Sequence, residues 1–442
     1  MSRSQINRPQ APTDLGQDDS GCPILHVDMD AVYASVEIAR QPHLRGKALI
    51  VGGEGGRGVV LAASYEARRY GIHSAMPMTR ALRLAPDLVI VPPDGRHYAE
   101  VSGAVMEMFA AITPQVEPLS LDEAFLDVGG ARRTFGSPRQ IAERIRAQVY
   151  DEQGITCTVG VAPTKFVAKL ASTQGKPDGL LVVPADRVIA FLHPMPVGAL
   201  WGVGEKTEEQ LHRLGLRTVA DIAHTPRATL IRALGQAAGS HLHDLSWGRD
   251  PRSVQTHERE RSIGNEETFA RDVDDPEVVL AELLRLSEKV GRRLRKAGFS
   301  GSTVSIKVRF ADFTTITRTR TRKVPTDVGR EIFHDARTLY EALHLDRARI
   351  RLVGVRMEGL RQVEEVETQL VLGAPERGWR EAEEAVDQLV HRFGRGSVRP
   401  ARLLPEGPGH PPDARSSPPA GPTLAPPGAD ARVLAGPGDT RA

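Results

Sequence analysis

The first half of the chain alternates between short apolar runs and segments with helical spacing, which predicts strands separated by helices. Expected strands, each rich in Val, Ile, Leu or Ala, are 24–28, 48–51, 58–63, 88–91, 123–128 and 156–161. Expected helices, with apolar residues three or four positions apart, are 32–40, 64–69, 78–84, 97–111 and 138–151. This order predicts a mixed α and β region that begins near Pro23.

Beyond Pro184 the pattern changes to short helices split by glycine turns. The expected helices there are 186–192, 205–213, 218–223 and 227–234. The segment from Trp247 to Pro251 combines Gly and Pro with charged residues, which is typical of a domain boundary.

A second strand-and-helix unit is expected to follow, up to about Leu360. It has strong helical periodicity over 276–297 and β-branched strands over 302–310 and 313–322. Residues 378–393 predict one more amphipathic helix, with its apolar stripe at Trp379, Ala382, Val386, Leu389 and Phe393.

Composition is that of an ordinary soluble protein, with 442 residues, 40% hydrophobic and 26% charged. No apolar run is long enough to span a bilayer, and the polar first twenty residues do not form a signal peptide. Cys22 and Cys157 are the only cysteines, so we expect a reducing, cytoplasmic location. The ends, 1–21 and 405–442, have the composition of disordered segments.

Carboxylates inside two of the apolar runs are the most informative chemistry. Asp28 ends one expected strand, and Asp122 and Glu123 begin another, 122 − 28 = 94 positions later. A single buried carboxylate is costly, but several that converge can hold Mg²⁺, which prefers oxygen ligands. If the fold brings these acids together, they could bind the metal ions that assist phosphoryl transfer.

Residues 26–37 (HVDMDAVYASVE) and 120–124 (SLDEA) resemble motifs of the Y-family translesion DNA polymerases, most closely the DinB or DNA polymerase IV branch. The likeness runs from about residue 23 to about 373. It implies an α+β multidomain, right-hand polymerase with palm, fingers, helical thumb and a C-terminal α/β little-finger domain, flanked by disordered termini. The implied parts are a leader at 1–21, palm at 22–32 and 92–172, fingers at 33–91, thumb with helix-hairpin-helix at 173–247, linker at 248–256, little finger at 257–363, clamp-binding peptide and extra helix at 364–404, and tail at 405–442.

The resemblance assigns roles around the metal site. Asp28, Asp122 and Glu123 match the catalytic acids that hold two Mg²⁺ ions, and Met29 matches the position that offers a main-chain carbonyl to a metal. Asp30 lies in the motif without being a family ligand, so we expect a structural role for it.

Nucleotide contacts are implied in the same way. Tyr33 matches the steric gate, the ring that excludes a ribose 2′-hydroxyl. Tyr65, Arg68 and Lys165 match residues that contact the incoming triphosphate. Without the motif, each would be read as an ordinary core aromatic or surface charge.

Three positions depart from the usual pattern. Val32 replaces an aromatic neighbour of the gate, Ala62 replaces a frequent threonine, and Leu61 stands where small residues are common. Val32 bears on sugar discrimination, Ala62 on phosphate binding, and Leu61 on the space above the nascent base pair.

Two glycine-rich segments resemble phosphate-binding motifs. Residues 53–58 fit GxGxxG, but the strand pattern continues directly afterwards, so a hairpin loop is the better interpretation. Gly202 and Gly204, with the helix that follows, predict a helix-hairpin-helix whose backbone N–H groups face a DNA phosphate. A plain helical hairpin is the alternative.

Basic residues gather in the second unit. The stretch from residue 292 to residue 323 contains ten Lys and Arg residues and a single acidic residue, Asp312. Arg318, Arg320 and Arg322 alternate with threonines, so a strand would place them on one face, where they could follow a DNA backbone. A solvated strand face is the alternative.

Residues 369–373 (QLVLG) resemble the peptide by which such polymerases bind the replication sliding clamp. Gln369, Leu370 and Leu372 would dock in extended form, with the leucines in an apolar pocket.

The function expected from these features is template-directed, error-prone translesion DNA synthesis without proofreading, by a monomer that binds primer-template DNA and deoxynucleoside triphosphates. A noncatalytic adaptor and a plain DNA-binding module are the rival hypotheses. The presence of all three acids argues against the adaptor, and the joint presence of the gate and triphosphate residues argues against the plain module.

Overall fold

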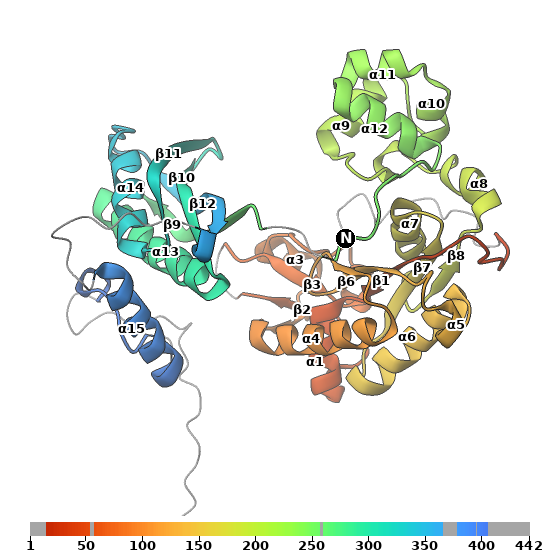
Figure 1. The fold of residues 1–442 in the computed structure, drawn as a ribbon, viewed down its shortest axis with the longest axis horizontal. Helices are drawn as coiled ribbons and strands as arrows, with labels where there is room; N and C mark the ends of the chain where they lie inside the picture. The colour runs from red at the N-terminus through yellow and green to blue at the C-terminus, as the bar shows by residue number, and fades with distance from the viewer. Residues whose placement is uncertain (1–14, 54–56, 257–259, 366–377, 395, 405–442) are drawn as a thin grey trace, which may run out of the picture. The chain divides into compact units, whose positions relative to one another are not determined.

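The computed structural model describes residues 15–53, 57–256, 260–365, 378–394 and 396–404. The chain forms two compact units, Met1–Glu258 and Arg259–Ala442 (Figure 1). Of the segments predicted to be disordered, 1–21 and 405–442, residues 1–14 and 405–442 lie outside the described residues.

The first unit is built on a five-stranded sheet with the order β5-β6-β1-β7-β8. β7 and β8 run parallel, whereas the other neighbours are antiparallel. The strands are β1 (Ile24–Met29), β5 (Val116–Pro118), β6 (Glu123–Asp127), β7 (Cys157–Ala162) and β8 (Leu180–Val182).

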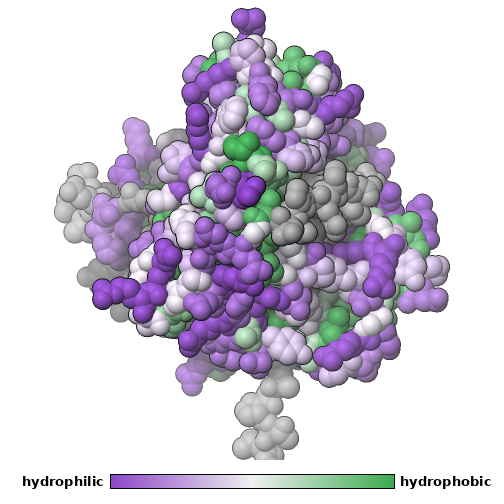
Figure 2. Space-filling view, turned by 90° about the vertical axis from the view of Figure 1, so that its right-hand side faces the viewer, coloured by the Kyte–Doolittle hydropathy of each residue, from purple (hydrophilic) through white to green (hydrophobic). Residues whose placement is uncertain are grey.

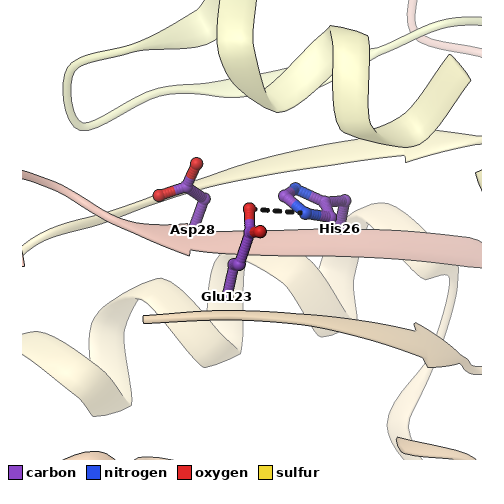
Figure 3. A group of neighbouring side chains, drawn as sticks. All are labelled: His26, Asp28 and Glu123. Carbon is purple, nitrogen blue, oxygen red and sulfur yellow. Dashed lines mark ion pairs between the residues drawn. The ribbon is translucent and has the colours of Figure 1, made fainter. Parts of the chain in front are cut away.

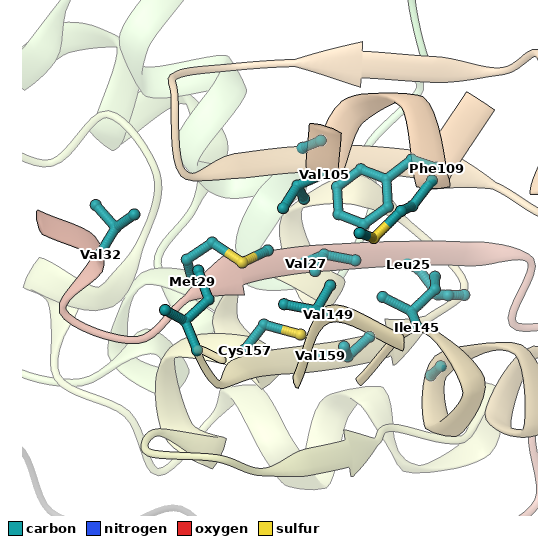
Figure 4. Packing of buried hydrophobic residues seen from close by; sticks show 14 of the residues in the cluster. Leu25, Val27, Met29, Val32, Val105, Phe109, Ile145, Val149, Cys157 and Val159 are labelled. Carbon is teal, nitrogen blue, oxygen red and sulfur yellow. The ribbon is translucent and has the colours of Figure 1, made fainter. Parts of the chain in front are cut away.

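Helices cover both faces of this sheet (Figure 1). On one face, α4 (Gly95–Ile112) and α6 (Pro138–Gln153) pack against Leu25, Val27 and Met29 of β1 (Figure 4). On the other face lies α7 (Lys165–Gly175). Because side chains alternate along a strand, His26 and Asp28 of β1 point toward the α7 face.

A smaller three-stranded sheet, β3-β2-β4, follows β1 in the chain. β2 (Leu49–Gly52) and β3 (Val60–Ala63) are antiparallel, in agreement with the predicted hairpin, and no helix begins directly after Gly58. The other elements of this region are α1 (Val32–Arg40), η2 (Pro42–Leu44), α2 (Tyr65–Arg68), α3 (Met78–Leu84) and β4 (Val89–Val91).

A helical region completes the first unit. Its apolar side chains join those of α7 in one core that includes Phe166, Phe191 and Leu245. The remaining elements of the unit are α5 (Arg132–Phe135), η3 (Ala185–Arg187), α8 (Val188–Leu192), η4 (Val197–Ala199), α9 (Glu205–Arg213), α10 (Val219–His224), α11 (Arg227–Leu234) and α12 (Gln236–Ser246).

The second unit has a four-stranded antiparallel sheet with the order β11-β10-β12-β9. The helix α13 fills its core with Leu283, Leu286 and Val290 against the sheet. The elements are β9 (Ser262–Val273), α13 (Pro276–Ala297), β10 (Phe299–Phe310), β11 (Thr315–Thr326), α14 (Gly329–Glu341), β12 (Ile350–Gln362), η5 (Val363–Glu365), α15 (Trp379–Phe393) and η6 (Ala401–Leu403).

Two expected boundaries differ from the structure. Leu15 is buried in the core that includes Phe166, so the ordered chain begins before the end of the leader predicted at 1–21. Strand β8 joins the five-stranded sheet although it lies beyond the palm limit predicted at 172. Both segments are short, and their apolar residues pack against residues that are distant in the sequence. The local pattern of apolar residues therefore does not show where these segments belong.

Candidate active site

Asp28 and Glu123 lie directly opposite each other in the β1–β6 register. Facing side chains in an antiparallel pair are close neighbours, so the two carboxylates emerge side by side toward α7. Ligand atoms of His26, Asp28 and Glu123 all lie within 4.8 Å of one another (Figure 3). The pairing of these strands therefore brings together two acids that are distant in sequence.

Asp122 sits just before β6, and its main chain adjoins the cluster. The carbonyl oxygen of Asp122 accepts a hydrogen bond from the Met29 N–H at 2.9 Å. Its carboxylate accepts from the Ser120 hydroxyl at 2.5 Å, and it is not among the groups within 4.8 Å at His26, Asp28 and Glu123. Burial raises the pKa of Tyr33, the expected gate, and the charge of Asp122 adds to that rise.

Two lysines balance the paired acids. Lys176 donates to the carboxylate of Asp28, and also to the main-chain carbonyl of Met29 at 3.2 Å. Lys169 donates to Oε2 of Glu123 at 2.5 Å. Since like charges facing each other across a sheet are unfavourable, these ammonium groups allow both acids to remain on one face.

Burial acts to raise the pKa of both carboxyl groups, but the net shifts of their pKa values differ. Burial raises the pKa of Asp28, and the charge of Lys176 opposes that rise. Burial alone would also raise the pKa of Glu123, but the contacts of its carboxylate, among them the Lys169 ammonium, outweigh it and lower the pKa to about 2. Glu123 is thus ionised throughout the physiological pH range.

His26 lies beside Glu123 and has no exposed surface. Its Nε2 is 3.4 Å from Oε2 of Glu123, and its Nδ1 is 2.7 Å from the Ser172 hydroxyl. Burial lowers the pKa of His26.

Asp30 is a buried hub, as its expected structural role requires. Its carboxylate accepts from the hydroxyls of Tyr65 at 3.2 Å, Thr156 at 2.9 Å and Thr158 at 3.0 Å. The main-chain N–H of Asp178 is a fourth donor at 2.8 Å. The carboxylate therefore ties β1 to β7, to the chain after α7 and to α2.

Tyr33 is partly buried at the start of α1, where its ring stacks on Tyr98 with centroids 4.5 Å apart. The Tyr98 hydroxyl donates to buried Glu37 at 2.8 Å, which fixes the supporting ring. The gate expected from the sequence is thus held by packing and lies near the charge of Asp122.

Of the departures from the family pattern, Val32 and Ala62 are buried in the core of the first unit. Leu61, on β3, is 42% exposed, which leaves its side chain available to a ligand.

Among the triphosphate residues, Tyr65 and Arg68 belong to one short helix, α2. The Arg68 guanidinium lies over the Tyr65 ring at 4.6 Å and donates through Nε to the Ala63 carbonyl at 3.0 Å. Because Tyr65 also bonds Asp30, α2 is linked to the strand that carries Asp28.

Lys165 does not join the carboxylate cluster. Its side chain is 5% exposed, pairs with Glu117 at 2.5 Å and donates to the Ser253 carbonyl at 3.3 Å. The lysine found at Asp28 is Lys176, which the sequence reasoning missed. His26 and Lys169 were also missed as members of the cluster, although His26 lies in the quoted motif two positions before Asp28 and therefore on the same strand face.

The oxygens of this cluster fit a hard cation. Asp28 and the Met29 carbonyl already hold a cationic group, the Lys176 ammonium, at one point. Carboxylate and carbonyl oxygens are the ligands that Mg²⁺ prefers, and no cysteine belongs to the group. The donor set therefore suits the ion expected from the sequence.

The glycines of the expected helix-hairpin-helix precede α9. Gly202 has a φ of +96°, a conformation that favours glycine, and Gly204 is the N-cap of α9. A Cβ at either position would meet nothing within 4 Å, so the turn is open at the helix N-terminus. This geometry is compatible with a phosphate contact.

The arginines of β11 share one side of the strand, as their spacing predicts, but they differ in surroundings. Arg318 is exposed. Arg320 and Arg322 pair with Asp335 of α14 at 3.4 and 2.6 Å, and Arg322 also pairs with Glu331 at 2.7 Å. The expected one-sided charge is thus partly neutralised, because acids outside the window 292–323 fold over it.

Gln369, Leu370 and Leu372 lie outside the described residues. Within the described ranges, no helix combines the length and apolar character that crossing a membrane requires. The face drawn in Figure 2 is largely hydrophilic, with hydrophobic residues scattered among polar ones.

Three family descriptions match successive parts of the chain. The impB/mucB/samB family matches residues 27–173, the helix-hairpin-helix motif of the IMS family matches 185–216, and the impB/mucB/samB C-terminal domain matches 260–372. The first includes every residue of the carboxylate cluster except Lys176 and His26, and the second includes Gly202 and Gly204.

Individual proteins agree with this division. A DNA polymerase IV from Desulfatibacillum aliphaticivorans is 42% identical over 395 residues, which cover 86% of this chain and 96% of the relative. A solved Y-family DNA polymerase chimera matches with a TM-score of 0.71 and 26% identity, over 76% of this chain and 98% of the other. An insertion ternary complex of Dbh DNA polymerase matches over the same shares, at 26% identity and a TM-score of 0.57. The chain therefore belongs to the Y-family DNA polymerases, in their DNA polymerase IV branch.

Proposed function

We propose that Asp28, Asp122 and Glu123 catalyse template-directed addition of deoxynucleotides to a primer terminus, including synthesis past template damage. In this reaction the primer 3′-hydroxyl attacks the α-phosphate of the nucleotide, and pyrophosphate leaves. The observation that supports the proposal most strongly is the facing of Asp28 and Glu123 in the β1–β6 register.

The residues that would hold Mg²⁺ are Asp28, Asp122, Glu123 and the carbonyl of Met29. When bound there, two Mg²⁺ ions supply a lowered pKa for the attacking hydroxyl and neutralise charge on the transferring phosphate. For this, Lys176 has to leave the oxygens of Asp28 and Met29, and its ammonium is then available to the anionic triphosphate. We therefore assign Lys176 a triphosphate contact, and we assign Lys165 the buried pair with Glu117.

The nucleotide is selected by shape and charge. The Tyr33 ring, supported by Tyr98, limits the space at the sugar. Arg68 can form paired hydrogen bonds to phosphate oxygens, and the Tyr65 ring lies beneath its guanidinium.

The DNA contacts that we propose are the open turn at Gly202 and Gly204 and the exposed Arg318 on β11. We further propose that the protein acts as a monomer in the cytoplasm and is recruited by the replication sliding clamp through Gln369, Leu370 and Leu372.

The experiment that tests this function is primer extension on templates with and without an abasic site, using purified full-length protein, Mg²⁺ and four deoxynucleotides. We expect extension through both templates, no excision of a mismatched primer end, and no extension by Asp28→Asn. Asp151→Asn, at an exposed position on α6, is the matched control and should extend normally. Extension that stops at every abasic site, or removal of the mismatch, would overturn the translesion or the error-prone part of the proposal.

A further inference from the structure

Helix α7 approaches strand β7, the neighbour of β1, very closely at one position. Gly160 on β7 is the register partner of His26 on β1. A Cβ added at Gly160 would lie 2.1 Å from the Ala168 carbonyl and 2.4 Å from the Ser172 nitrogen, so only glycine permits this packing. The close approach sets Ser172 and Lys169 of α7 directly on the His26 ring.

The protons in this contact can be assigned. The Ser172 hydroxyl donates to the Lys169 carbonyl at 2.9 Å, and it lies 2.7 Å from Nδ1 of His26. A hydroxyl has one hydrogen to donate, so the proton between Ser172 and His26 belongs to Nδ1. The Lys169 ammonium, which can only donate, lies 3.3 Å from Nε2, so Nε2 is the ring nitrogen that accepts.

Lys169 connects this ring to the catalytic acid. Its Nζ donates to Oε2 of Glu123 at 2.5 Å while His26 accepts from the same ammonium. The hydrogen bond occupies Oε2 and fixes the plane of the carboxylate, while Oε1 remains available to a metal ion. The Lys169 side chain is 29% exposed, so these contacts hold it without burying it completely.

A tryptophan from the helical region also contacts Lys169. The Lys169 ammonium lies 5.8 Å from the centroid of the Trp201 ring, within the range of a cation–π contact. Trp201 stacks on Phe125, two residues after Glu123 on β6, with centroids 5.9 Å apart. Trp201 also immediately precedes Gly202, the first glycine of the open turn.

We propose that Lys169 is a positioning residue for Glu123, held between His26 and Trp201, and that Trp201 links the glycine turn to the catalytic carboxylate. This inference rests on the proposed function, because it assigns Glu123 to metal binding. It adds a connection between the region expected to hold DNA and the acid that acts on the primer terminus.

The proposal predicts two effects of opposite sign. Lys169→Met removes a positive charge beside the metal ligands, so a divalent ion should bind more tightly. The same change releases the carboxylate of Glu123, so the chemical step should become slower. Simple structural damage at the site would weaken metal binding and catalysis together, and the two explanations are therefore distinguishable.

The test uses full-length protein and measures both effects. Mn²⁺ binding, followed by the electron paramagnetic resonance signal of the free ion, should tighten by roughly threefold in Lys169→Met. In single-nucleotide addition, kcat should fall by about tenfold or more, with little change in KM for the nucleotide. Lys169→Arg should restore much of kcat, and Lys47→Met, at an exposed lysine, should match the wild type in both assays.

A double-mutant cycle tests the contribution of Trp201. Trp201→Leu should lower kcat in the wild-type background but have little further effect when Lys169 is already Met. Additive effects would overturn the link through Trp201. Unchanged kcat, or weaker Mn²⁺ binding in Lys169→Met, would overturn the positioning role, whereas an inactive wild type would instead refute the proposed function.

Discussion

At the scale of single residues, the proposed catalytic face of the sheet is organised by charge balance. Asp28 and Glu123 face each other across two strands, and each has its own lysine, Lys176 and Lys169. Without these cations the carboxylates would repel each other on a partly buried surface. The balance offsets the repulsion between the acids and leaves oxygens for a metal ion.

Tyr33 gives the most specific prediction at this scale. Tyr33→Ala removes the ring that stacks on Tyr98, so we expect the preference for deoxyribonucleotides over ribonucleotides to fall by roughly tenfold or more. The measurement is single-nucleotide addition with each sugar. Tyr98→Phe keeps the supporting ring and should retain most of the preference, and an unchanged preference in Tyr33→Ala would reject Tyr33 as the gate.

Asp30 should matter for stability rather than for chemistry. Asp30→Asn turns one acceptor into a donor that faces the hydroxyls and the N–H now bonded to the carboxylate. We expect the free energy of unfolding of the first unit to fall by roughly 2–4 kcal/mol. Urea unfolding measures this, with the exposed Asp151→Asn as a control that should change it little. A wild-type midpoint for Asp30→Asn would show that the hub is not needed for stability.

At the scale of elements, α13 carries a carboxyl group, that of Glu288, whose pKa is raised. Burial, together with the charge of Glu383, raises the pKa of Glu288 to about 7 from its usual 4.5. A folded pKa above the unfolded value means that protonation favours folding. This contribution is complete below about pH 4.5 and is lost as the pH rises through about 7.

The prediction is that Glu288→Gln makes the second unit melt at a higher temperature than the wild type above pH 7, whereas the two should converge near pH 4.5. Thermal unfolding at several pH values checks it, and Glu277→Gln on an exposed part of α13 is the control. Parallel curves for wild type and Glu288→Gln would contradict the assignment.

The arginines of β11 should separate into two classes. Arg318→Ala, at an exposed residue, should weaken DNA binding and reduce the dependence of log affinity on log salt by about one unit. Arg322→Ala leaves buried Asp335 without its 2.6 Å partner, so it should lower the stability of the second unit by roughly 1–3 kcal/mol. Equal effects of both changes on DNA binding and stability would refute the distinction.

The elements also show what sequence can predict here. Helices with regular apolar spacing, such as 276–297 and 205–213, were predicted with the bounds that the structure has. Among the elements that the prediction missed are α7 and β8, because α7 contains polar residues that face the proposed active site and β8 is only three residues long. Asp28 and Glu123 were identified from their motifs, but Lys169 and Lys176 became visible only when α7 was placed over β1.

At the scale of the whole molecule, the chemistry and the basic strand belong to different compact units. The first unit contains the acids, the gate and the glycine turn, and the second contains the sheet with Arg318. Beyond residue 372, where the family C-terminal match ends, α15 adds to the second unit. Its Glu383 accepts hydrogen bonds from Gly329 and Arg330 at the start of α14, so α15 is attached by specific contacts.

The central claim is that one acidic cluster makes this chain a template-directed polymerase. The most direct measurement is single-nucleotide addition to a primer opposite each of the four template bases, with wild type beside Asp122→Ala and with primer-template affinity measured in parallel. We predict addition that follows the template base in the wild type, and loss of addition with retained DNA affinity in Asp122→Ala. Continued synthesis by that variant, or addition that ignores the template base, would contradict the account.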